Sequence, residues 1–305
     1  YFVIATGSEA SGLKNIEFDE KVVVSSTGAL ELKKIPEKMI IVGAGVIGLE
    51  MGSIYSRLGT EVTVVEFFDK VLNGMDHDIS KNFKSILQKQ GFKFHLNSSV
   101  SMITKEKKGV KVTFKQLDSH DQNELSADVV LVATGRKPFT KNLKLENIGV
   151  TLNPKGQIET DNNWRTTATN IFALGDVTSG PMLAHKAEEE GIAVAEIVAG
   201  QAGHVNFQVI PSVVYTDPEV ASVGKTENEL KEEGIQVKVG KFSFMGNGRA
   251  KTVFSSNGFV KIIADSNNDR ILGAHIIGPA AGDLIHEVCM AMESVSYTHL
   301  TLPTN

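Results

Sequence analysis

Cysteine is nearly absent from this sequence, with one residue, Cys289, among 305. A single cysteine excludes an intrachain disulfide framework and a metal site built on several cysteines, and we predict no metal site of another kind. Cys289 falls in a helical pattern with Ile285, Val288 and Met292 on the same face. That spacing predicts that the thiol packs in a core as a small apolar group rather than reacting as a thiolate.

The sequence also lacks an excess of positive charge and long apolar runs. The formal net charge of −5 gives no electrostatic basis for binding nucleic acid or an anionic membrane, so we predict neither as a partner. The apolar runs are too short to span a bilayer, and no targeting segment with a cationic leader is visible. Because the chain opens on Tyr1 within a strand-like run, we expect a fragment of a longer protein. Its length is sufficient for two globular domains.

Glycines stand at dinucleotide-binding spacing between a predicted strand and a predicted helix. Met39–Val42 is typical of a buried parallel strand, and Val46–Leu58 has helical spacing. Gly43, Gly45 and Gly48 occupy the G-x-G-x-x-G positions between them. The first glycine permits a tight turn, the second lets the backbone approach a pyrophosphate, and the third permits close packing of helix on strand. The free amides at the helix start would then face the phosphates.

A second predicted strand, Glu61–Glu66, ends in an acid eighteen residues after Gly48. A carboxylate at this position can accept the ribose hydroxyls of NAD and repels the 2′-phosphate of NADP. The following residues, Phe67, Phe68 and Asp69, include no arginine that would neutralise such a phosphate. A solvated acid at the end of a strand is the alternative, but the complete strand, glycine, helix, strand and acid series favours NAD.

Two strands end in the same Ala-Thr-Gly turn, at Ala5–Gly7 and Ala133–Gly135, as expected at the carboxyl edges of two doubly wound sheets.

A helix over Leu183–Val198 is predicted to carry Lys186, Glu188, Glu189 and Glu190 outward as a solvated face. Other predicted elements are an Asp76-led helix, a strand at Phe92–Leu96, a strand pair at Ser101–Glu106 and Val110–Leu117 before a polar loop through Ser119, His120 and Asp121, strands at Asp128–Thr134, Ile171–Val177, Val209–Tyr215, Gln236–Phe244, Gly258–Ala264 and Ile271–Ile277, and a helix at Gly282–Met292.

Longer strings carry a family resemblance. They are ATGS at 5–8, VGAGVIGLEMGS at 42–53, VTVVE at 62–66, ATGRKPFT at 133–140, LGDV at 174–177, GPMLAHKAEEEG at 180–191, PSVVYTDPEVASVGKTE at 211–227 and ILGAHIIGP at 271–279. From Tyr1 to about Glu293 the chain resembles the flavoprotein pyridine nucleotide-disulfide oxidoreductases. The strings at 180–191 and 218–227 point to the lipoamide-oxidising branch of that family.

The resemblance implies FAD and NAD as cofactors. The positions implied for NAD are Gly43, Ala44, Gly45, Val46, Ile47, Gly48, Leu49, Glu50, Glu66, Val100 and Gly135. Those implied for FAD are Thr6, Gly7, Ser8, Asp176, Met182, Leu183, Ala184 and His185. Glu50 would face the nicotinamide and Asp176 a ribityl hydroxyl. The helix start at Met182–His185 would stabilise the negative charge of reduced flavin, and a structural hydrogen bond is favoured over proton transfer for His185.

The predicted fold class is α/β: a Rossmann-like doubly wound NAD domain, a partial FAD domain, and an α+β dimerisation domain. The expected limits are 1–35 for a remnant of the FAD domain and its connector, 36–150 for the NAD domain, 151–206 for the returning FAD segment, 207–293 for a partial dimerisation domain and 294–305 for a tail. That tail, SVSYTHLTLPTN, departs from the family pattern and is expected to be foreign sequence.

The implied reaction is oxidation of a protein-bound dithiol through a disulfide and FAD to NAD⁺. Such chemistry needs a cysteine pair and a His–Glu base, which the family places upstream and downstream of this chain, so we assign no catalytic residue and expect this chain alone to be inactive. The implied partners are a second copy and the lipoyl domains of 2-oxo acid dehydrogenase complexes or the glycine cleavage system. The implied compartment is the mitochondrial matrix for a eukaryotic source and the cytoplasm for a bacterial one. Alternatives are another flavin disulfide reductase, such as a soluble transhydrogenase, and a non-catalytic chain that binds NAD or a partner subunit.

Overall fold

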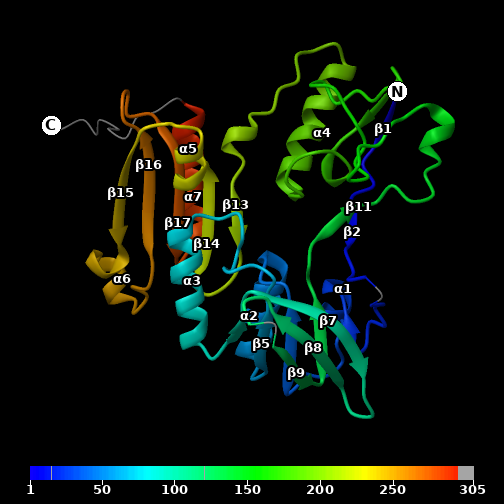
Figure 1. Cartoon of the computed structure of the whole chain (residues 1–305). Coiled ribbons are helices and arrows are strands. Elements are labelled where there is room, and N and C mark those ends of the chain that lie inside the picture. The colour runs from blue at the N-terminus through cyan, green and yellow to red at the C-terminus, as the bar shows by residue number, and fades with distance from the viewer. Residues whose placement is uncertain (15, 120, 295–305) are drawn as a thin grey trace. The chain divides into compact units, whose positions relative to one another are not determined.

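The computed structural model describes residues 1–14, 16–119 and 121–294, which form two compact units (Figure 1). The first unit comprises Tyr1–Ser11 and Gly135–Ile210. The second comprises Gly12–Thr134 and the described residues from Pro211 onward. Each unit has its own hydrophobic clusters, and each is described separately below.

The second unit is centred on a parallel sheet with the strand order β3-β10-β4-β5-β6. Its strands are β3(Val23–Val24), β4(Lys38–Val42), β5(Glu61–Val65), β6(Lys93–His95) and β10(Val129–Val132). Ile41 pairs with Val64 on one side and with Leu131 on the other. Side chains of β4 and β10 are buried on both faces, which explains their unbroken apolar sequences.

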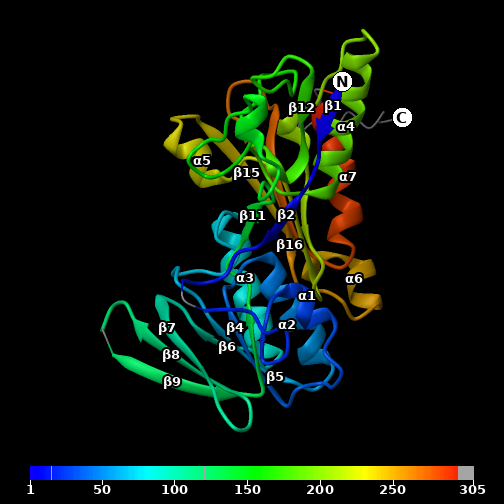
Figure 2. The ribbon, with the colours of Figure 1, turned by 90° about the vertical axis from the view of Figure 1, so that its right-hand side faces the viewer.

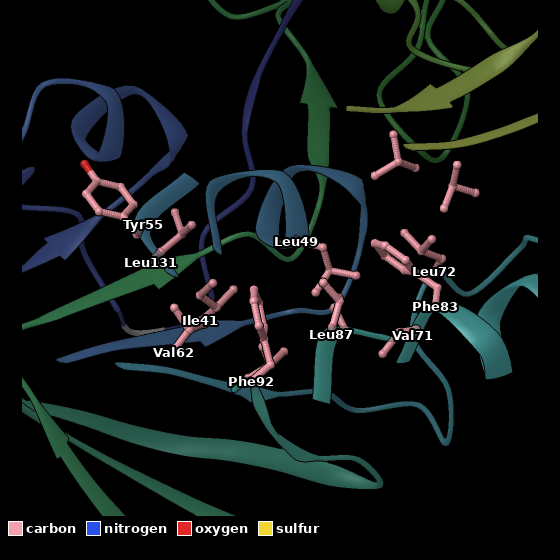
Figure 3. Packing of buried hydrophobic residues seen from close by; sticks show 14 of the residues in the cluster. Ile41, Leu49, Tyr55, Val62, Val71, Leu72, Phe83, Leu87, Phe92 and Leu131 are labelled. Carbon is pink, nitrogen blue, oxygen red and sulfur yellow. The ribbon is translucent and has the colours of Figure 1, made fainter. Parts of the chain in front are cut away.

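Helices cover one face of this parallel sheet and a smaller antiparallel sheet covers the other. The helices are α1(Ser26–Leu30), α2(Val46–Arg57) and α3(His77–Lys89). Leu49 of α2 and Phe83 and Leu87 of α3 share one cluster with Ile41 of the sheet and with Phe92 (Figure 3). On the other face, Val65 and Val130 share a cluster with Val112 and Phe114 of the antiparallel sheet. That sheet consists of β7(Ser98–Lys105), β8(Val110–Gln116) and β9(Gln122–Ala127), and Figure 2 shows it beside the parallel strands.

The remainder of the second unit is a five-stranded antiparallel sheet with the order β13-β14-β17-β16-β15. Its elements are β13(Ser212–Val214), β14(Glu219–Gly224), α5(Glu227–Glu232), β15(Val237–Ser243), the 3-10 turn η4(Phe244–Gly246), α6(Gly248–Thr252), β16(Phe259–Asp265), β17(Ile271–Gly278) and α7(Ala281–Glu293). Val214, Val220, Phe259 and Ile277 pack in the same cluster as α2 and α3. The two five-stranded sheets of this unit are therefore joined by one continuous core.

The first unit contains two short strand pairs and one long helix. β1(Phe2–Ile4) is parallel to β12(Ile171–Ala173), and β2(Ser8–Ala10) is antiparallel to β11(Arg136–Pro138). The other elements are η1(Leu145–Ile148), η2(Gly175–Val177), α4(Ala184–Val198) and η3(Phe207–Val209). Among the residues described, none of the helices has the length and apolarity that crossing a bilayer requires.

Several elements differ from the sequence-based expectations. The predicted connector within residues 1–35 contains β3 and α1, and β3 adds an edge strand to the parallel sheet. The predicted strand pair after β6 is three-stranded, because the polar segment β9 pairs with β8. β14 and α5 were not predicted, although a capping box between Thr226 and Glu229 marks the start of α5. The domain limits remain predictions, and of the expected tail only Ser294 lies within the described residues; His120 also lies outside them.

Candidate functional site

The turn after β4 requires a glycine at its first position. Gly43 has a φ of +104°, and its N–H donates to Val65 O at 2.9 Å, which ties the turn to the end of β5. A Cβ at Gly43 would lie 2.5 Å from Ala133 O. Both the positive φ and this close approach of two backbones exclude any side chain here.

The other two glycines have different roles. A Cβ at Gly48 would lie 2.4 Å from Gly43 O and 3.0 Å from Ile41 Cγ2, so this glycine allows α2 to pack closely on β4. Gly45 has an ordinary extended backbone, and a Cβ there would meet nothing within 4 Å. Gly45 is thus not required by packing, which leaves open space where the phosphates of a dinucleotide would approach.

The start of α2 offers amide donors beside that open space. Gly45 is the N-cap, so the first-turn amides of Val46, Ile47 and Gly48 have no acceptor within the helix. Within the part of the chain that the structure describes, no side chain caps this helix. Unpaired amides and the positive end of the helix dipole together favour an anion.

Glu66 lies beside the glycine turn, as predicted from its place at the end of β5. The residue is only 7% exposed, and its carboxylate accepts hydrogen bonds from the backbone N–H groups of Ala44 and Phe68, the latter at 2.8 Å. Two carboxylate oxygens can accept about four hydrogen bonds, so acceptor capacity remains for ribose hydroxyls. The Ala44 amide, in contrast, already donates to Glu66, so the amides available to a phosphate are those from Val46 onward.

An aromatic pair next to Glu66 was not predicted as part of the site. The rings of Phe67 and Phe68 are 56% and 47% exposed and meet edge to face with centroids 5.5 Å apart. Exposed aromatic faces can stack on a nucleobase, and the acid beside them would hold the attached ribose. The signal for this pair in the sequence is two aromatic residues directly after the acid at the end of the strand.

The remaining positions implied for NAD lie in varied environments. Glu50 is half-buried, its Oε1 accepts from Tyr215 N at 2.8 Å, and burial raises the pKa of its carboxyl group, partly opposed by this hydrogen bond. Leu49 is fully buried in the core, so only its backbone can face a ligand. Val100 is half-buried on β7 opposite Phe114. Gly135 lies in the first unit with a φ of +124°.

In the first unit, residues from three separate motifs meet. Ser8 Oγ donates to a carboxylate oxygen of Asp176, while Arg136 Nε donates to Ser8 Oγ at 2.7 Å. Thr6 Oγ1 donates to Phe139 O at 2.7 Å, and Gly7, at a φ of +74°, accepts from Phe139 N. Ser8 and Asp176, two of the positions implied for FAD, are therefore in direct contact within one unit.

The start of α4 follows the prediction, but its charged residues do not. Leu183 is the N-cap, Met182 and Leu183 are half-buried, and Ala184 and His185 are exposed. The expected outward face is wrong for two residues, because Lys186 and Glu190 are 1% and 2% exposed and form an ion pair at 2.9 Å. Glu188 and Glu189 are exposed as predicted.

The buried pair has a structural partner in the turn that contains Asp176. Glu190 accepts from Gly175 N at 2.7 Å, and Lys186 Nζ lies 3.5 Å from Gly175 O. The two side chains therefore bind both the N–H and the C=O of Gly175, the residue directly before Asp176. A charge run in the sequence gave no signal for this arrangement, because an inward i, i+4 pair and a solvated face have the same composition.

Cys289 should react slowly with thiol reagents. It is half-buried on α7, and burial raises the pKa of its thiol to about 11. A free cysteine has a pKa near 8.5, so a pKa of about 11 lowers the thiolate fraction at neutral pH by roughly 300-fold. We expect labelling by iodoacetamide to be slower than that of glutathione by about this factor. Labelling at the rate of glutathione would show that the thiol is exposed and that its pKa is not raised.

The similarities to known proteins cover nearly the whole chain. Residues 1–191 match the family described as pyridine nucleotide-disulphide oxidoreductase, and residues 210–300 match the dimerisation domain of that family. The mitochondrial dihydrolipoyl dehydrogenases of Homo sapiens and Rattus norvegicus are each 53% identical over 293 residues, 95% of this chain. The chain spans 58% of the length of these curated relatives.

Solved structures of related proteins have the same fold. LpdA from Mycobacterium tuberculosis has a TM-score of 0.88 at 27% identity, over 96% of this chain and 63% of that one. The HOCl-induced flavoprotein disulfide reductase RclA from Escherichia coli has a TM-score of 0.87 at 30% identity, over 97% and 67%. These similarities confirm the predicted fold class, in which α/β dinucleotide-binding parts precede a dimerisation domain.

Proposed function

This chain belongs to the pyridine nucleotide-disulphide oxidoreductase family, and we propose that it is the NAD-binding and dimerisation part of a dihydrolipoyl dehydrogenase. The activity proposed for the whole protein is oxidation of protein-bound dihydrolipoamide, with electrons passing through a disulfide and FAD to NAD⁺. The identity of 53% to dihydrolipoyl dehydrogenases, against 27% and 30% to LpdA and RclA, favours this member of the family. The observation that carries the proposal is the glycine turn beside Glu66.

The residues of the second unit fit a bound NAD. The first-turn amides of α2 would hold the pyrophosphate across the open space at Gly45, and Glu66 would accept the hydroxyls of the adenosine ribose. The exposed rings of Phe67 and Phe68 would lie against the adenine. Glu50, at the opposite end of the first turn of α2, would then be nearer the nicotinamide.

The residues of the first unit fit a family member that binds FAD. When bound, FAD supplies the two-electron step between a dithiol and the nicotinamide. Asp176 is proposed to hold a ribityl hydroxyl, with its position fixed by Ser8 and by the bond from Gly175 N to Glu190. In the described region no side chain caps the N-terminus of α4, so its first-turn amides and the positive end of its dipole would be available to the flavin.

We propose that this chain alone does not turn over dihydrolipoamide. Thiol–disulfide exchange with a dithiol needs two cysteines, whereas the sequence holds only Cys289, a half-buried thiol with a raised pKa. Mixed with dihydrolipoamide, FAD and NAD⁺, the chain should form no NADH above the background rate. Catalytic NADH formation that requires the chain would contradict this part of the proposal.

Partners and compartment are proposed from the family. The dimerisation domain matched over residues 210–300 supports a homodimer, and the lipoyl domains of 2-oxo acid dehydrogenase complexes or of the glycine cleavage system are the proposed protein substrates. The relatives at 53% identity are mitochondrial, which supports the mitochondrial matrix for a eukaryotic source.

Substituting Glu66 with Gln should test the coenzyme preference. The unmodified chain is expected to bind NADH at least about 100-fold more tightly than NADPH, because the carboxylate repels a 2′-phosphate. In Glu66→Gln, charge-assisted hydrogen bonds to the ribose are lost, so NADH affinity should fall about tenfold while NADPH affinity rises. Both affinities are measured by nucleotide fluorescence titration.

The control for this substitution is Glu61→Gln, at the exposed start of the same strand, which should leave both affinities unchanged. Thermal unfolding of each variant separates a binding effect from a folding effect, since Glu66 also accepts two backbone hydrogen bonds. Equal affinity of the unmodified chain for NADH and NADPH would refute the proposed role of Glu66. Failure of the unmodified chain to bind NADH would refute the proposed function.

A further inference from the structure

A buried ionic cluster lies in the second unit, away from the glycine turn. Lys261 of β16 is 2% exposed, and its Nζ lies 3.0 and 2.9 Å from the two carboxylate oxygens of Asp76. The same nitrogen lies 3.2 Å from Asp78 and 2.7 Å from Glu227. An ammonium group has three protons, so all of its donors are directed at carboxylates.

Lys261 is the buried cation of this site, and Asp76, Asp78 and Glu227 all pair with it. Burial disfavours its charge, but the hydrogen bonds to Glu227 and Asp76 outweigh that effect and raise the pKa of Lys261. His275 is its cross-strand partner on β17 and is also buried. Burial lowers the pKa of His275, opposed in part by Asp76, so the imidazole is neutral at pH 7.

Asp76 connects this lysine to the dinucleotide turn. It is 2% exposed and is the N-cap of α3, where its side chain accepts from Asp78 N at 3.0 Å. The segment between β5 and α3 therefore starts at Glu66 and ends at Asp76. Its start is fixed by the glycine turn, and its end is fixed by a lysine from the antiparallel sheet 185 positions further along the chain.

The same segment binds both backbone hydrogen-bonding groups of Ala44. Glu66 accepts from Ala44 N, and Leu72 N donates to Ala44 O at 2.9 Å. Val71 and Leu72 are buried in the core next to α2 and α3, so the segment has little freedom to adjust independently at its two ends. The chain from Asp76 to Leu72 and the hydrogen bonds from Leu72 to Ala44 and from Ala44 to Glu66 thus form one continuous path.

We propose that Lys261 is a positioning residue for the dinucleotide crevice, which it acts on through Asp76 and the segment 66–76. The inference rests on the proposed function, because it assigns a sequence-distant determinant to the same NAD site. A residue of the five-stranded antiparallel sheet then contributes to the affinity for the coenzyme. Lys261 itself touches neither Glu66 nor the glycine turn.

Lys261→Met tests this inference with Lys241→Met as its matched control. Lys241 also pairs with Asp78, at 3.3 Å, but it is 40% exposed and does not contact Asp76. In the full 305-residue chain, Lys261→Met should weaken NADH binding at least about tenfold, whereas Lys241→Met should change it less than about twofold. Near-UV circular dichroism and thermal unfolding show whether each variant is folded.

A neutral double variant separates tethering from unpaired charge. In Asp76→Asn/Lys261→Met the asparagine can still cap α3, and no carboxylate is left buried at position 76 without its cation. Folded protein with NADH affinity still reduced at least about fivefold supports the inference. Affinity restored to that of the unmodified chain would overturn it, because the tether is absent in this variant as well.

Hydrogen exchange on the unmodified chain gives a readout that depends on no variant. Since coupling between two sites is reciprocal, NADH should slow exchange in 66–76 and also around Lys261 in β16 and Glu227 at the start of α5. The helix α6, Gly248–Thr252, contributes no residue to this cluster and should be unaffected. Protection confined to the glycine turn and 66–70 overturns the inference but leaves the proposed function intact, whereas absence of any NADH binding refutes the proposed function itself.

Discussion

Gly45→Val should abolish NADH binding at concentrations that saturate the unmodified chain, a loss of at least about 100-fold or roughly 2.7 kcal/mol. A Cβ at Gly45 meets no atom within 4 Å, and the extended backbone there suits a β-branched residue, so the fold should be unaffected. The side chain would instead occupy the space through which a pyrophosphate reaches the amides of α2. Nucleotide fluorescence titration measures the affinity, and thermal unfolding measures the fold.

Two other glycines serve as controls for this substitution. Gly240→Val places the same side chain in open space on β15 of the same unit and should change neither stability nor binding. Gly48→Ala should lower the unfolding temperature, because its Cβ would lie 2.4 Å from Gly43 O. A Gly45→Val protein that is folded and binds NADH as well as the unmodified chain would show that the phosphates lie elsewhere.

Lys186→Met should lower the free energy of unfolding of the first unit by about 3–5 kcal/mol, because it leaves the carboxylate of Glu190 buried without its cation. Both residues are almost completely buried, and Glu190 also holds the amide of Gly175. The only tryptophan, Trp164, is buried in this unit. Its fluorescence during urea denaturation therefore reports on the unit that contains the substitution.

A double-mutant cycle identifies the cause of that loss. Glu190→Gln keeps an acceptor for Gly175 N, so Lys186→Met/Glu190→Gln should recover more than half of the lost stability. Glu189→Gln, at an exposed position on the same helix, should change stability by less than about 0.5 kcal/mol. A Lys186→Met protein as stable as the unmodified chain would mean that water reaches Glu190.

The dinucleotide turn could be predicted because its requirements are local. Gly43 needs a positive φ, Gly48 needs space against β4, and Glu66 follows at the end of the next strand, so each requirement appears as a residue type at a fixed spacing. The core helices were predictable because their apolar side chains repeat with the helical period, and the central parallel strands because they are short unbroken apolar runs.

Most of the features that were not predicted depend on partners outside the element itself. β9 has a polar sequence and is a strand because it pairs with β8, and β3 is only two residues long. The inward orientation of Lys186 and Glu190 depends on a turn that precedes them, and no periodicity in the helix specifies it. The meeting of Ser8, Arg136 and Asp176 likewise depends on how three segments fold together.

The hydrogen bond between Glu66 and the Ala44 amide has a consequence for redesign of the coenzyme preference. The residue that would have to be exchanged to admit NADPH is also part of the framework of the turn, because its oxygens satisfy two backbone donors. A basic or small replacement would leave those donors without acceptors. A successful conversion to NADPH should therefore need at least one compensating substitution that supplies a new acceptor near Ala44.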